Sequence, residues 1–67
     1  MGETALAMCK RHVREGAARI ARQRVLAEQL RDHGHSDLAD HADALLAQFV
    51  WIQEESVVHM ERLMART

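Results

Sequence analysis

Apolar residues recur with helical spacing over residues 4–33. Leu6, Val13, Ile20 and Ala27 repeat every seven residues, and a second series follows three places later: Cys9, Gly16, Gln23 and Leu30. Alternating steps of three and four place both series on one stripe, the seam along which two helices pack. We therefore predict a helix over about residues 4–33. Thr4 is the expected N-cap, because its hydroxyl can accept a hydrogen bond from a free backbone amide.

Residues 37–65 carry two neighbouring apolar stripes. The first consists of Leu38, Ala42, Leu45, Phe49, Ile52, Ser56, His59 and Leu63. The second consists of Ala39, Leu46, Val50, Gln53, Val57, Met60 and Met64. A helix that packs on one neighbour needs only a narrow stripe. We predict a helix over about residues 37–65 whose first stripe faces the first helix, while the second stripe has no cover within one chain.

The break between the two helices lies at about residues 34–36. Gly34 can adopt the left-handed conformation that ends a helix, and Ser36 or Asp37 is expected to cap the next one. Because the loop is so short, the helices must return antiparallel. Residues 1–67 are thus expected to form a single all-α domain, an antiparallel two-helix hairpin. We also expect a large side chain from another helix to pack over Gly16, a small residue in the seam.

Composition narrows the class of protein. The 67 residues allow one small domain, and 48% hydrophobic content with a net charge of −1 is typical of a folded chain. The longest apolar run, residues 44–52, is far shorter than the ~20 residues of a membrane span. A single cysteine precludes an internal disulfide. These features favour a cytoplasmic setting without membrane association.

Charge favours the pairing of the two predicted helices, and small size predicts self-association. Residues 1–33 carry seven basic and four acidic side chains (+3), and residues 34–67 carry two basic and six acidic ones (−4). A lone hairpin this small has little core, so we expect two copies to close a four-helix bundle, with a tetramer as the other possibility. The interface is predicted at Leu46, Val50, Val57, Met60, Met64 and Trp51. An unidentified protein partner is the alternative occupant.

Histidines supply the candidate metal chemistry. His33, His35 and His41 lie in and beside the turn, at a spacing that matches no standard zinc site. A second cluster depends on the hairpin, which should bring Cys9, His12, Glu55 and His59 together at the open end. Cys9 and His59 also lie in the predicted stripes, where packing alone explains them. No bound metal or other cofactor is therefore expected, and these residues remain candidates.

Catalysis and nucleic-acid binding have weaker support. No Ser/His/Asp or Cys/His arrangement is forced by local spacing, and there is no glycine-rich phosphate loop, so we predict no enzymatic activity. Five basic residues of the first helix could contact phosphates: Lys10, Arg11, Arg14, Arg22 and Arg24. They are spread around the helix, and the acidic second helix offsets their charge. Nucleic acid is thus an unfavoured partner.

The segments HVREGAARIARQRVLAEQLRDHGH and ALLAQF resemble a group of short bacterial helical-hairpin proteins of unknown function from soil and plant-associated bacteria. The resemblance lies in His12, Val13, Gly16, Gln23, Leu30, Gly34, His35, Leu45, Leu46 and Phe49. It implies a bacterial, cytoplasmic hairpin and carries no activity or cofactor.

Three functions follow as hypotheses. The leading one is a small, non-enzymatic, oligomeric interaction or regulatory protein. A metal-binding protein that uses histidines and a weak nucleic-acid binder are the alternatives.

Overall fold

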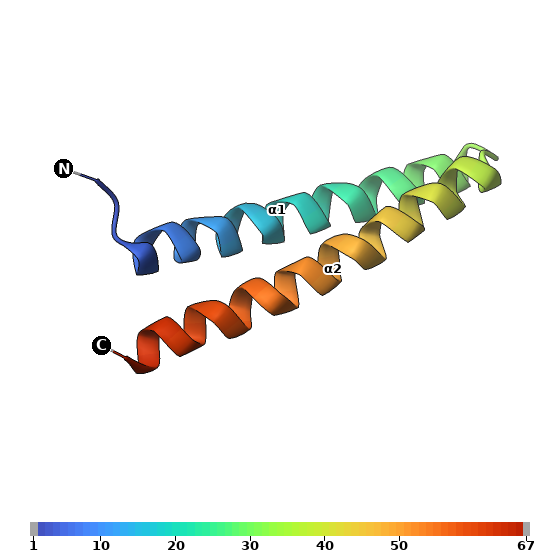
Figure 1. The fold of residues 1–67 in the computed structure, drawn as a ribbon. Coiled ribbons are helices and arrows are strands. Elements are labelled where there is room, and N and C mark those ends of the chain that lie inside the picture. Colours follow the sequence, from blue (N-terminus) through green and yellow to red (C-terminus); the bar gives the residue numbers. More distant parts are fainter. Residues whose placement is uncertain (1, 67) are drawn as a thin grey trace.

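The chain folds as two long antiparallel helices joined by a tight turn. The computed structural model describes residues 2–66, in which α1 spans Ala5–Asp32, α2 spans Ser36–Ala65, and no strand occurs. Figure 1 shows the helices side by side, with both ends of the chain at the end opposite the turn. The molecule measures 49 × 22 × 12 Å, and its smallest dimension is the thickness of one helix. The predicted all-α hairpin is confirmed as a single layer of two helices.

Helix α1 follows the predicted pattern closely. Thr4 is its N-cap, and the Thr4 hydroxyl oxygen accepts a hydrogen bond from the Ala7 amide at 3.0 Å. The seam residues are covered on this helix, with Gly16, Ile20 and Ala27 buried. The other five are half-buried: Leu6, Cys9, Val13, Gln23 and Leu30. The heptad pattern therefore identified the face by which α1 packs.

Gly34 makes the turn by adopting a φ of +80°. The amide of Gly34 donates to the Arg31 carbonyl at 3.1 Å, and the amide of His35 donates to the Leu30 carbonyl at 2.8 Å. This pair of bonds satisfies carbonyls that the end of α1 leaves free, in the pattern of a Schellman motif.

The predicted cap of α2 is wrong. The helix begins at Ser36, one residue earlier than expected, so Ser36 and Asp37 lie inside its first turn. The N-cap is His35, whose side chain makes no capping hydrogen bond. The connection is so tight that α2 starts directly after the residue that closes the turn, which leaves no extended position for a serine or aspartate cap.

The predicted division of α2 into a facing and an uncovered stripe is also wrong. Ala39 is fully buried, and Leu46, Val50, Val57 and Met60 of the supposedly uncovered stripe are half-buried against α1. Three residues of the supposedly facing stripe are about half exposed: Leu38, Leu45 and Ile52. The seam of α2 draws on both stripes and consists of buried or half-buried residues: Ala39, Ala42, Leu46, Phe49, Gln53, Ser56, Met60 and Leu63.

This outcome has a simple geometric reason. The two predicted stripes occupy four adjacent columns of the helix, and a heptad seam uses only two columns. The seam uses the middle two columns, one from each predicted stripe. The outer column of each stripe then lies beside the seam, one on either side.

Two glutamines cross the seam between the helices. Gln23 Nε2 donates to the carbonyl oxygen of Ala42 at 3.0 Å, and Gln53 Nε2 donates to the carbonyl oxygen of Val13 at 2.7 Å. Gln53 lies directly over Gly16, where an added Cβ would come within 2.9 Å of the Gln53 Cδ atom. The expectation that a large side chain packs over Gly16 is thus confirmed.

Candidate functional site

One side of the helical layer carries large exposed apolar side chains. Leu38, Leu45 and Ile52 each precede a seam residue of α2 by one position, and Leu26 precedes the seam residue Ala27 of α1. In an antiparallel pair, positions with this relation to the seam lie on the same side of the layer. We call these four residues the open face. Their exposed fractions are 44% for Leu26, 55% for Leu38, 47% for Leu45 and 51% for Ile52.

A groove of about 450 Å³ runs along this side beside Gly16. Both helices line it, through His12, Glu15, Gly16, Arg19, Phe49, Ile52, Gln53 and Ser56. The guanidinium of Arg19 lies 5.8 Å from the centre of the Phe49 ring, a cation–π distance. Gly16 contributes no side chain to this groove, and the Gln53 amide lies over Gly16 and bonds the Val13 carbonyl. Its lining combines an apolar floor with imidazole and guanidinium groups.

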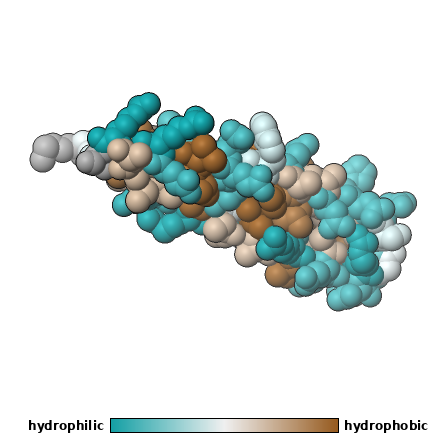
Figure 2. Space-filling view, turned by 90° about the horizontal axis from the view of Figure 1, so that it is seen from below, coloured by the Kyte–Doolittle hydropathy of each residue, from teal (hydrophilic) through white to brown (hydrophobic). Residues whose placement is uncertain are grey.

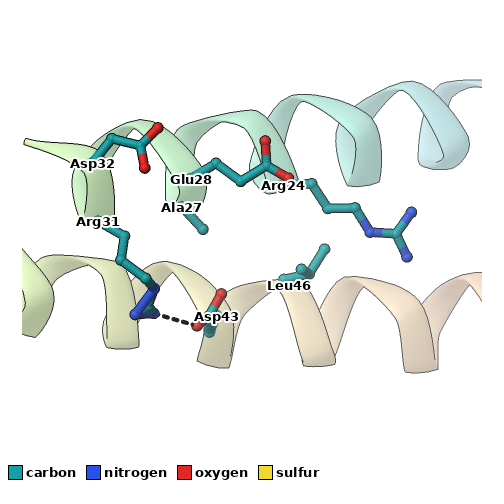
Figure 3. Close-up of a pocket in the computed structure, with 7 residues that line it drawn as sticks. All are labelled: Arg24, Ala27, Glu28, Arg31, Asp32, Asp43 and Leu46. Carbon is teal, nitrogen blue, oxygen red and sulfur yellow. Dashed lines mark hydrogen bonds and ion pairs between the residues drawn. The ribbon is translucent and has the colours of Figure 1, made fainter.

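The opposite side of the layer is charged. Arg31 of α1 reaches across to Asp43 of α2 at 2.7 Å and to Asp40 at 3.4 Å. Figure 3 shows the Arg31–Asp43 pair beside a hollow of about 220 Å³, into which Ala27 and Leu46 point from the two helices. The remaining lining residues are Arg24, Glu28 and Asp32. These ion pairs are exposed and contribute roughly 0.2–1 kcal/mol each, so they favour the observed pairing of helices without dominating it.

The predicted histidine cluster at the open end forms in part. Cys9 and His12 of α1 line a small hollow of about 60 Å³ together with Ser56 and His59 of α2. Glu55, expected in the same cluster, is exposed and is not among the residues that line the hollow. Within residues 2–66, no three histidine, cysteine or acidic side chains are grouped closely enough to hold a metal ion.

The turn histidines do not converge. The Nδ1 atom of His33 lies 2.8 Å from the carbonyl oxygen of Gln29, one turn back on its own helix. His35 is the N-cap of α2, and His41 is exposed on that helix.

Further apolar residues lie on the outer surface of α2. Trp51 is 64% exposed, and Val58, two helical turns later on the same column, is also exposed. Figure 2 views the molecule from the α2 side and shows hydrophobic patches separated by hydrophilic side chains. The predicted interface residues Trp51 and Met64 are exposed, whereas Leu46, Val50, Val57 and Met60 are already half-buried by α1. Sequence reasoning missed the open face, although Leu38, Leu45 and Ile52 have heptad spacing.

Several basic side chains of α1 are engaged within the chain. Arg11 pairs with Glu3 at 3.2 Å and with Glu15 at 3.7 Å. Arg31 and Arg19 contact α2 as described above. Of the five basic residues that motivated the nucleic-acid hypothesis, Arg11 is thus engaged in ion pairs within the hairpin.

Comparison with known proteins adds no identity. No family model, curated protein or solved structure matches the chain. Among residues 2–66, neither helix is both apolar and long enough to traverse a lipid bilayer.

Proposed function

We propose that this protein is a non-enzymatic interaction protein that works as a homodimer, in which two hairpins join by their open faces to close a four-helix bundle. The observation that carries the proposal is the exposure of Leu26, Leu38, Leu45 and Ile52 on one side of a single helical layer. Helical layers normally bury such a face against a second layer. A second copy supplies an identical apolar face, and two-fold symmetry makes the two faces self-complementary.

The exposed area of the chain is consistent with an interface to a second copy. The chain exposes 5190 Å², whereas area–mass scaling gives about 4,300 Å² for a compact protein of 7.6 kDa. The excess is about 900 Å² per chain. A standard specific interface buries about 800 Å² on each partner. Pairing of two hairpins would thus bring the exposed area of each chain to the value of an ordinary globular protein.

The energetics also favour a dimer. The buried hydrophobic residues of one hairpin are Ile20, Ala27, Ala39 and Ala42, three of which are alanines. Full burial of a Leu or Ile side chain contributes about 1.5–3 kcal/mol, and the open-face residues are already about half covered. The eight such side chains of a dimer would therefore contribute roughly 8 kcal/mol. This is comparable to the whole stability of a small domain.

The dimer leaves the outer surface of α2 free for a further partner. Trp51 and Val58 lie on the column of α2 farthest from its seam, so association by the open face does not cover them. Tryptophan is enriched among the residues that dominate binding energy at protein interfaces. The interaction or regulatory role follows from this arrangement, with the dimer as the scaffold and the Trp51 surface as the contact for another protein.

The test is a pair of charge substitutions in the open face. We expect the double variant Leu45→Asp, Ile52→Asp to sediment as a monomer and to lose most of its helical circular dichroism, because ionised groups are strongly disfavoured in a buried apolar interface. Val58→Asp is the matched control, with the same chemistry at an exposed apolar position of the same helix. It should remain dimeric and helical.

Two results would contradict the proposal. One is a wild-type chain that sediments as a helical monomer at all accessible concentrations. The other is a double variant that stays dimeric while Val58→Asp dissociates, which would place the interface on the outer surface of α2.

A further inference from the structure

We propose that two copies of the chain bind one divalent transition-metal ion of the zinc class through His12 and His59 of each copy. This inference rests on the proposed dimer. Within one chain these residues do not complete a site, since no three ligand side chains are suitably grouped among the described residues. The second copy supplies the missing pair of histidines.

Each chain prepares half of the site at the open end of the hairpin. His12 of α1 and His59 of α2 line one small hollow with Cys9 and Ser56. Both histidines are exposed, whereas Cys9 and Ser56 are half-buried in the seam behind them. The imidazole rings are therefore accessible to a partner on the open-face side. The seam residues behind them leave little room for the rings to turn toward the interior.

The heptad pattern places both histidines in line with the open face. His12 lies two heptads before Leu26 on α1, and His59 lies two heptads after Leu45 on α2. Residues separated by whole heptads share one column of a helix that packs along such a seam. A second copy seated on Leu26 and Leu45 must also approach His12 and His59.

Charge determines the relative orientation of the two copies. With the two turns at the same end, each α1 lies against the partner's α2. With the turns at opposite ends, α1 lies on α1 and α2 on α2. Residues 1–33 carry +3 and residues 34–67 carry −4, so only the first arrangement sets unlike charges against each other. That arrangement brings both copies of His12 and both copies of His59 to one level of the bundle.

Four imidazoles at one level match the needs of a zinc-class ion. Zinc takes four nitrogen or sulfur ligands in tetrahedral geometry, and neutral imidazole also suits nickel and copper. Cys9 is the only thiol in the chain and lines the same hollow as the two histidines. Helix bundles commonly build metal sites from side chains that face inward on neighbouring helices.

The experiment uses the full chain after treatment with a chelator and zinc chloride as the probe. Calorimetric titration at neutral pH should give one zinc per two chains, and sedimentation should show a dimer without zinc that tightens when zinc is added. Substituting cobalt should produce the visible absorption of a tetrahedral centre. His12→Ala and His59→Ala should each weaken zinc binding more than about tenfold, since even a change to the groups that orient ligands costs that much. The triple variant His33→Ala, His35→Ala, His41→Ala is the control and should bind as the wild type does.

The outcomes separate this inference from the proposed dimer. A dimer that binds no zinc, or one zinc per chain, would overturn the shared site and leave the dimer standing. So would zinc binding that the control triple variant loses and His12→Ala retains. A chain that is monomeric both with and without zinc would overturn the site and the dimer together. Circular dichroism of each variant confirms that the helices persist, so that lost binding reports on the ligands.

Discussion

Gln53 occupies a seam position where packed helices usually place an aliphatic side chain. Its Nε2 atom donates to the Val13 carbonyl at 2.7 Å, and its amide covers the gap that Gly16 leaves. Gln23 makes the equivalent bond from α1 to α2. Among the described residues no buried side-chain nitrogen or oxygen lacks a hydrogen-bond partner. Polar seam residues of this kind specify register at some expense in stability, because only one alignment satisfies them.

We expect Gln53→Ala to lower the free energy of unfolding by about 0.5–1.5 kcal/mol, the usual net contribution of one hydrogen bond. Gly16→Ala should change stability by less than about 1 kcal/mol. The added Cβ displaces the Gln53 amide, but alanine is the better helix former by a similar amount. In the Gly16→Ala background, Gln53→Ala should therefore lower the free energy of unfolding much less than it does in the wild type. Thermal and urea unfolding of the four proteins gives the coupling energy, and strict additivity would mean that Gln53 and Gly16 act independently.

At the scale of the elements, the turn decides how the helices align. The positive φ of Gly34 and the two amide bonds to Arg31 and Leu30 set the point at which α2 starts. Ala39 and Ala42 of α2 and Ala27 of α1 are all buried near the turn, where small side chains let the helices approach closely. The alignment set at the turn then carries along the seam to the Gln53–Val13 bond and to the hollow at Cys9.

Gly34→Ala should destabilise the hairpin by about 1–2 kcal/mol, because an L side chain in a left-handed conformation meets the following carbonyl. The matched control is Gly2→Ala. A Cβ at Gly2 would have no neighbour within 4 Å, and Gly2 precedes α1. Chemical denaturation of both variants measures the difference. Equal stability of the two would show that the turn does not need the left-handed conformation.

At the scale of the whole molecule, the hairpin is more extended than a compact domain of the same length. Its radius of gyration is 15.3 Å, whereas a compact domain of 67 residues has a value of about 11 Å. A single layer 12 Å thick leaves both of its sides in water. One side carries ion pairs suited to solvent, and the other carries the open face. This asymmetry is the reason that the proposed dimer uses one side only.

If folding and association are coupled, stability must depend on the concentration of the chain. Each tenfold increase in concentration should add about 1.4 kcal/mol to the apparent stability of the dimer, so the melting temperature should rise by several degrees. Circular dichroism melts across a hundredfold range of concentration measure this effect. The Leu45→Asp, Ile52→Asp variant, which we expect to be monomeric and largely unfolded, should give a weak helical signal at every concentration. A wild-type melting temperature that does not move with concentration would contradict coupled folding.

Local signals in the sequence determined much of the hairpin. The packing face of α1, the Thr4 cap, the reversal at Gly34 and the need for a large side chain over Gly16 are all confirmed. Each depends on interactions within one or two helical turns, or on the absence of a side chain. Such features are encoded by neighbouring residues, so periodicity and residue type suffice to predict them.

The tertiary structure alone decided which side of α2 meets α1. Four adjacent columns of α2 are apolar, and a heptad seam uses only two of them. Periodicity alone does not indicate which two columns face α1. The choice depends on steric fit across the seam, with small residues such as Ala39 and Ala42 near the turn and Gln53 over Gly16. The same alignment exposes Leu45 and Ile52 and brings His12 beside His59. Contacts between residues far apart in the chain arise only once two surfaces pack, and no local pattern specifies them.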